Sequence, residues 1–189
     1  MMSIKIKEDM TMLGLIKHPI VSSSDDQIVK DEVEAFYESY AFFDTFEDVK
    51  EISDGVVSLV CTKMVPEDPI KNYVPMYCFD IVVGYEHVGM INLRIGHTKA
   101  LYYGGHIGYG VDENHRGKGY AARACLLLKD LAKRHEMKRL FISNRYDNVA
   151  SIRVCQKIGA TYVRTVLLPE DHDMRKDGLS YINIWIWDI

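Results

Sequence analysis

The spacing of apolar residues changes along the chain, from a helical period near its start to strand-like runs after residue 56. Over residues 25–46 the apolar side chains recur at steps of three and four, which predicts an amphipathic helix with an acidic opposite face. Residues 84–86 read as the turn of a hairpin between two short runs of β-branched and apolar residues. The strands predicted in this part cover 56–64, 76–83, 87–95 and 105–111.

The second half of the chain alternates strands with helices. Its apolar stripe predicts a helix over 120–135, and a second helix over 148–158 ends at Gly159, a residue typical of the position just past a helix end. Strands are predicted over 139–143, 161–168 and 180–189. Strands first and then a β-α-β-α-β-β order indicate an α/β fold with a mixed sheet. Because no linker or repeat divides the sequence, we expect a single domain over 1–189.

Charge and composition exclude several classes of protein. The net charge is −4, but residues 25–54 hold eleven acidic residues and two lysines, a net −9, so the remainder carries +5. A general nucleic-acid binder needs a basic face, which makes that function a poor fit. No apolar run approaches the length of about 18 residues that spans a bilayer, and the start lacks a signal-peptide pattern. We therefore expect a cytoplasmic protein without a membrane partner.

The cysteines and histidines do not form a metal-binding pattern. The four cysteines lie in apolar stretches without CxxC spacing and are expected to be buried free thiols, and no pair among the seven histidines has the i, i+4 spacing of helical metal ligands. The sequence therefore predicts no metal.

The densest chemistry lies in residues 108–121, where a strand ends, a glycine-containing loop follows and a helix begins. The free N–H groups and the dipole at a helix N-terminus form an anion site, to which Arg116 and Lys118 add positive charge. A P-loop would need Ser or Thr after Lys118, where the chain has Gly119. A dinucleotide-binding fingerprint would need a third glycine after Gly108 and Gly110, and it is missing.

Arg116-Gly117-Lys118-Gly119-Tyr120-Ala121 resembles the acetyl-CoA loop of the GCN5-related N-acetyltransferase (GNAT) family, which has the form Arg/Gln-x-x-Gly-x-Gly/Ala. Residues 148–160 resemble a later motif of that family, with Asn148, a small residue three positions on, and Lys-x-Gly closing at Gly159. The resemblance covers 105–163 as an acetyl-CoA-binding core, whereas 1–55 match poorly. It implies a single-domain GNAT-type fold, with a mixed, mostly antiparallel central sheet containing a splayed strand pair and flanked by helices.

The resemblance also implies which residues bind acetyl-CoA. The pantetheine arm would lie between the splayed strands, against backbone groups of Gly110 and Val111. Backbone N–H groups of the loop would hold the pyrophosphate, with two basic side chains around it, and three polar residues would meet the cofactor from the other side. The loop residues are Arg116, Gly117, Lys118, Gly119, Tyr120 and Ala121, and the polar residues are Asn144, Asn148 and Ser151.

Proton transfer is the point where the sequence departs from the family pattern. Many members carry a Tyr seven residues after the Asn, where this chain has Cys155, and an acidic residue or His nine residues before the loop Arg, where it has Ile107. The resemblance therefore assigns no general base. Tyr109 lies on the same strand face as Ile107 and His106 on the opposite face. We rank Tyr109 first and His106 second as candidate catalytic residues.

The function implied is transfer of an acetyl group from acetyl-CoA to a primary amine of an unidentified small molecule or peptide, by direct attack of the amine on the thioester. A sensor that binds acyl-CoA without catalysis, and an enzyme that uses a longer acyl-CoA, stay open. Because the family often forms dimers, a homodimer is one expectation. The acidic face of the helix over 25–46 is either solvated or attracts a cationic acceptor.

Overall fold

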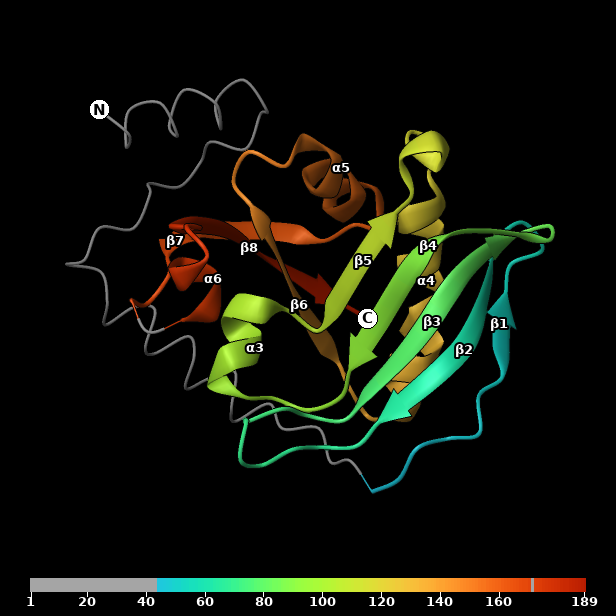
Figure 1. The fold of residues 1–189 in the computed structure, drawn as a ribbon, viewed down its shortest axis with the longest axis horizontal. Helices are drawn as coiled ribbons and strands as arrows, with labels where there is room; N and C mark the ends of the chain where they lie inside the picture. The colour runs from blue at the N-terminus through green and yellow to red at the C-terminus, as the bar shows by residue number, and fades with distance from the viewer. Residues whose placement is uncertain (1–43, 171) are drawn as a thin grey trace.

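The computed structural model describes residues 44–170 and 172–189, which form two antiparallel sheets flanked by helices (Figure 1). The larger sheet has the order β1-β2-β3-β4-β5, and every neighbouring pair in it is antiparallel. Its strands are β1 (Glu51–Ser53), β2 (Ser58–Val65), β3 (Met76–Val83), β4 (Glu86–Arg94) and β5 (Ile107–Val111).

The smaller sheet has the order β6-β8-β7 and is also antiparallel. It consists of β6 (Arg139–Arg145), β7 (Thr161–Leu167) and β8 (Tyr181–Asp188). The helices of the described chain are α3 (Lys99–Gly104), the 3-10 turn η2 (Glu113–His115), α4 (Tyr120–Arg134), α5 (Val149–Lys157) and α6 (Asp173–Lys176).

Helix α4 covers one face of the five-stranded sheet (Figure 1). Alternation along β3 and β4 places Phe79, Ile91 and Leu93 on this face, where they are almost completely buried with Leu128 and Leu131 of α4. Burying such apolar surface is the main favourable contribution to folding. A second apolar cluster lies around α3, where Tyr102 packs near Phe141 of β6.

Backbone hydrogen bonding joins the two sheets just before β5, at His106. The N–H of His106 donates to the carbonyl oxygen of Phe141 on β6 at 2.7 Å, and the N–H of Phe141 donates to Nδ1 of His106 at 2.8 Å. Gly105 (φ 73°) allows this approach, because a Cβ there would lie 3.1 Å from the backbone nitrogen of Ser143. Beyond this contact, no backbone hydrogen bond joins β5 to β6 in the described chain, and the strands diverge (Figure 1). We call this divergence the splay.

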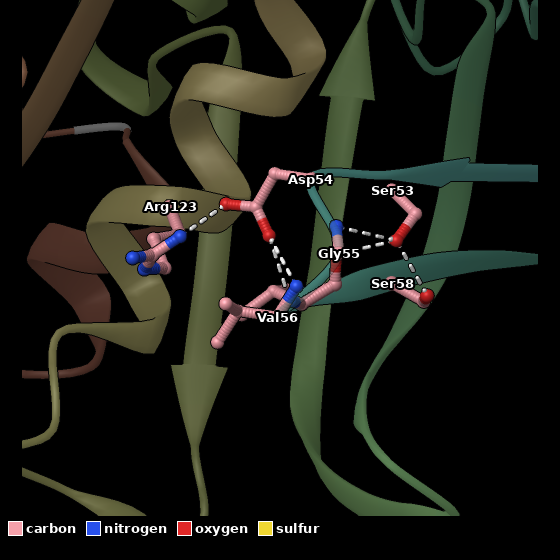
Figure 2. A network of polar contacts seen from close by, with 7 residues as sticks. Ser53, Asp54, Gly55, Val56, Ser58 and Arg123 are labelled. Atoms are coloured by element: carbon pink, nitrogen blue, oxygen red, sulfur yellow. Dashed lines mark hydrogen bonds and ion pairs between the residues drawn. The ribbon is translucent and has the colours of Figure 1, made fainter.

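The turn between β1 and β2 is fastened to α4 by one carboxylate (Figure 2). Oδ1 of Asp54 accepts the backbone N–H groups of Val56 and Val57, and Oδ2 lies 2.6 Å from Nη1 of Arg123 on α4. The bonds to backbone N–H groups and to Arg123 hold the pKa of Asp54 below its usual value. The turn therefore fixes the edge of the five-stranded sheet against the helix.

Glu47, in the segment before β1, is held against the end of α4 in a similar way. Its backbone N–H donates to the hydroxyl of buried Tyr77 at 2.7 Å, and that hydroxyl lies 2.8 Å from Nε2 of His135. Its carboxylate pairs with Arg134 at 2.7 Å. The negative charge of Glu47 is thus partly neutralised by Arg134 of α4.

Most elements predicted from the sequence are confirmed within two residues at each end, including the β3–β4 hairpin turn at residues 84–85. Four short elements were not predicted: β1, α3, η2 and α6. The helix predicted over 25–46 lies outside the described residues except for 44–46, which are irregular. The mixed α/β arrangement with a splayed pair is confirmed, although every hydrogen-bonded strand pair in the described chain is antiparallel.

Candidate functional site

The loop between β5 and α4 presents backbone N–H groups at the end of the splay. Gly117 (φ 79°) and Gly119 (φ 84°) adopt left-handed conformations that other residues rarely take. The first hydrogen bond of α4 runs from the N–H of Arg123 to the carbonyl oxygen of Gly119, so the preceding N–H groups have no partner inside the helix. Gly119 is the N-cap and provides no side chain to satisfy them. The loop is therefore built like an anion site.

The basic residues of the loop differ in position. Arg116 folds back on the strand, with Nε donating to the carbonyl oxygen of Val111 at 3.0 Å, which closes the loop over η2. Lys118 is exposed. His115 lies 3.4 Å from the carboxylate of Glu86 on the neighbouring β4. Arg116 thus ties the loop to its own backbone, whereas Lys118 is a cationic side chain exposed at the surface.

Gly108 and Gly110 leave one face of β5 without side chains. The N–H of Gly108 donates to Oδ1 of Asn92 at 3.2 Å, and a Cβ on Gly108 would lie 3.1 Å from the Asn92 amide. A Cβ on Gly110 would meet nothing within 4 Å, so the surface over this exposed residue is open. Val111, the last residue of β5, is half-buried against the core.

Tyr109 connects β5 to α5. Its hydroxyl lies 2.8 Å from Oγ of Ser151, and Ser151 itself is bonded through its N–H to Oδ1 of Asn148 at 3.1 Å. Asn148 is therefore the N-cap of α5, as expected for this residue type. Burial raises the pKa of Tyr109 well above its usual value, so the phenol stays protonated at neutral pH and can donate a hydrogen bond.

His106, the second catalytic candidate, is fully buried at the base of the splay. Nδ1 accepts the Phe141 N–H, which places the ring proton on Nε2, 3.0 Å from the carbonyl oxygen of Gly96 and 3.2 Å from Nδ1 of His97. Burial, with the neighbouring His97, lowers the pKa of His106 to about 3. The geometry is that of a neutral residue that joins three segments of chain, and its catalytic role stays a prediction.

Asn144 lies at the end of β6 with its amide buried, and its contacts were not anticipated from the sequence. Nδ2 donates to Sγ of Cys155 at 3.5 Å, and Oδ1 accepts from Nδ2 of Asn183 at 3.0 Å. Beyond Asn183 the bonds continue to Thr165 and Tyr162 on β7. The sequence signal was Asn183, a polar residue between apolar neighbours in β8.

A separate hollow of about 770 Å³ lies along the C-terminal half of α4. It is bordered by residues 47–52 and by Leu127, Asp130, Leu131 and Arg134. Three of the acids from the N-terminal acidic segment line it, and one of them, Glu47, already pairs with Arg134. Asp31, Glu34 and Glu38 belong to the acidic face of the helix predicted over 25–46, and they lie outside the described residues.

Within residues 44–170 and 172–189, no three or more His, Cys, Asp or Glu side chains gather as metal ligands would. In the same part of the chain, no helix combines the length and the apolar character that crossing a bilayer requires.

The family model and the solved structures that match the chain are described as acetyltransferases. The model of the family described as the acetyltransferase (GNAT) family matches residues 33–160. No curated protein sequence matches the chain.

Among solved structures, a protein from Vibrio cholerae described as a ribosomal-protein-serine acetyltransferase is 15% identical, with a TM-score of 0.53 over 77% of this chain and 100% of that one. RimL, a ribosomal L7/L12 alpha-N-protein acetyltransferase in complex with coenzyme A, is 16% identical, with a TM-score of 0.53 over 75% and 98%. The microcin C7 self-immunity acetyltransferase MccE, in complex with acetyl-CoA and AMP, is 21% identical, with a TM-score of 0.48. That match covers 60% of this chain and 61% of MccE.

Proposed function

Because the chain belongs to the GNAT acetyltransferase family, we propose that it transfers an acetyl group from acetyl-CoA to a primary amine of a small molecule or peptide. The observation that carries the proposal is the loop at residues 116–121, where N–H groups without partners in α4 stand at the end of a splayed strand pair. A diphosphate suits such a site because it is an anion with several acceptor oxygens.

In the proposed complex, Gly117 to Ala121 hold the diphosphate through their backbone N–H groups, and Lys118 adds charge. The pantetheine arm runs along the edge of β5 that β6 leaves unpaired, where Gly110 and Val111 present backbone groups. Asn148 and Ser151 face the arm from α5. Both polar atoms of the Asn144 amide already have protein partners. Asn144 is therefore proposed to act on the cofactor indirectly, through its contact with Cys155.

The chemical step is an acyl transfer in four changes of bonding. The lone pair of the neutral amine attacks the thioester carbonyl carbon, and the new C–N bond gives a tetrahedral intermediate. The carbonyl oxygen gains the negative charge, which backbone N–H groups of the unpaired β5 edge stabilise. The C=O bond then re-forms as the C–S bond breaks with its electron pair on sulfur, and the ammonium proton passes to water. The protonated Tyr109 is the proposed hydrogen-bond donor to the leaving thiolate.

The acceptor is proposed only as a class. RimL, which shares the fold at 16% identity, is named for acetylating the α-amine of a ribosomal protein. That likeness reports the fold and not the substrate. An amine panel should therefore include polyamines, aminoglycosides, amino acids and N-terminal peptides.

Titration calorimetry with acetyl-CoA tests the cofactor site. We expect binding by the wild-type protein and at least about tenfold weaker binding by Gly119→Ala, because a side chain in a left-handed conformation distorts the loop. Gly178→Ala is a matched control: its φ is 91° against 84° for Gly119, neither Cβ would meet an atom within 4 Å, and Gly178 lies outside the loop. Equal losses in both variants, or no heat from the wild-type protein at millimolar acetyl-CoA, would refute the proposal.

Release of free CoA across the amine panel tests the transfer itself. Turnover with any acceptor supports the enzyme, whereas tight binding of acetyl-CoA without turnover would leave a sensor of acyl-CoA as the function.

A further inference from the structure

A row of buried polar side chains crosses the three-stranded sheet beneath α5. Oγ1 of Thr165 on β7 donates to Oδ1 of Asn183 on β8 at 2.7 Å, and Nδ2 of Asn183 donates to Oδ1 of Asn144 on β6 at 3.0 Å. Nδ2 of Asn144 then donates to Sγ of Cys155 on α5 at 3.5 Å. The hydroxyl of Tyr162 lies 2.8 Å from Thr165 Oγ1. We call these five side chains the polar row.

All hydrogens in the polar row point the same way. The single hydroxyl proton of Thr165 is donated to Asn183, so Tyr162 must donate to Thr165. Every bond from Tyr162 onwards therefore has its positive end towards Cys155. Bonds aligned in this manner polarise one another, and the effect is stronger in a buried, weakly polar environment.

The polar row ends next to the site already described. Cys155 lies one helical turn after Ser151 on the same face of α5, and Ser151 bonds the hydroxyl of Tyr109. The electrostatic neighbours of Tyr109 include Cys155 and Cys125. Cys155 also occupies the position where many family members carry the Tyr that protonates the leaving thiolate.

Stability alone does not require these residue types. Asn144, Asn183 and Thr165 are at most 8% exposed, and burying amides and hydroxyls is favourable only when every bond is made. Apolar side chains fill the adjacent positions of β6 and β8, such as Ile142 and Trp185, on the same face. A row of aligned donors is therefore a specific arrangement in an otherwise apolar layer.

We propose that the polar row stabilises the negative charge that develops on the coenzyme A sulfur when the C–S bond breaks. The row ends at Cys155, one helical turn from Ser151 and its bond to Tyr109, so the positive ends of its hydrogen bonds are directed towards the proposed reacting centre. The electron pair of the C–S bond goes to sulfur, the ammonium proton passes from the new amide nitrogen to water, and coenzyme A leaves as the thiolate. The five side chains are positioning residues, and the inference rests on the proposed function.

The ultraviolet absorbance of the bound thiolate tests this inference without turnover. Coenzyme A bound to the wild-type protein should ionise at a lower pH than free coenzyme A, because the row favours the anion. Burial raises the pKa of Cys155 to about 12 and those of the other three cysteines as well, so protein thiols contribute little at lower pH. The complex with desulfo-coenzyme A, which has no thiol, gives the background.

Thr165→Val removes the hydroxyl at nearly constant volume and interrupts the row. We expect the thiol of bound coenzyme A to ionise about 0.5 pH unit higher than in the wild type, kcat to fall about threefold, and KM for acetyl-CoA to stay unchanged. Thr161→Val is the matched control on the same strand, because Thr161 is exposed and has no part in the row.

Two results would overturn the inference. One is normal binding of coenzyme A to Thr165→Val, with its thiol ionising at the same pH as in the wild-type complex. The other is an equal shift in Thr161→Val. If Thr165→Val does not fold, Tyr162→Phe replaces it, since it keeps the ring against Trp185 and removes only the first donor. Absence of coenzyme A binding by the wild-type protein would instead refute the proposed function, so the two failures are distinguishable.

Discussion

The two sheets on either side of the splay bury their helix-facing surfaces differently. The five-stranded sheet presents an apolar face to α4, with Phe79, Ile91 and Leu93 among its most buried side chains. The three-stranded sheet places Asn144, Asn183 and Thr165 in a comparably buried position beneath α5. The first surface gains its free energy from apolar burial, whereas the second adds to its apolar side chains a polar row whose hydrogen bonds contribute little net stability and hold oriented dipoles. The comparison teaches that the larger sheet supports the fold and the smaller one contributes polarity to the site.

Truncating the apolar face should produce the largest effect on stability. Phe79→Ala removes a ring that is 1% exposed, and we expect the free energy of unfolding to fall by about 3–5 kcal/mol. Met90→Ala, on the opposite face of the neighbouring strand and 61% exposed, should cost less than about 0.5 kcal/mol. Urea unfolding at neutral pH measures both. Similar costs for the two variants would contradict the assignment of stability to the α4 face.

His106, whose hydrogen bonds to Phe141 join the two sheets, should make the stability depend on pH. The pKa of His106 is about 3 in the folded protein and about 6.5 in an unfolded chain, so lowering the pH favours the unfolded state, which binds the proton first. Between pH 6.5 and 5 the free energy of unfolding should fall by about 2 kcal/mol from this residue alone.

His106→Asn provides the comparison for that measurement, because its side-chain oxygen can still accept the N–H of Phe141. Burial also lowers the pKa of His135, which acts in the same direction and is present in both proteins. The difference between the two pH curves therefore isolates His106. Parallel curves would show that His106 does not titrate as described.

Tyr109, which connects β5 to α5 through Ser151, should affect turnover more than stability. Tyr109→Phe keeps the ring but removes the hydroxyl bonded to Ser151, and we expect kcat to fall about tenfold with little change in KM for acetyl-CoA. Tyr73→Phe, in the exposed loop between β2 and β3, is the control. Steady-state release of coenzyme A with a working acceptor measures both. Unchanged turnover in Tyr109→Phe would exclude its hydroxyl as the donor to the leaving thiolate.

The sequence predicted the elements around the loop at residues 116–121 well because they depend on local patterns. Apolar spacing identified α4 and α5, and the glycines with Arg116 and Lys118 identified the loop before any contact was known. The short elements β1 and α3 were missed, since three to six residues carry too little periodicity to be recognised. The contacts of His106 could not be predicted either, because its partners at Gly96 and Phe141 are fixed by the meeting of two sheets.

By itself, the sequence determined the family, the order of strands and helices and the loop at residues 116–121, because each of these lies within a short stretch of chain. Only the tertiary structure brought together Tyr162, Thr165, Asn183, Asn144 and Cys155, which come from three strands and a helix. The physical reason is that strand register decides which side chains share a row across a sheet, and register depends on pairing between segments that are distant in sequence.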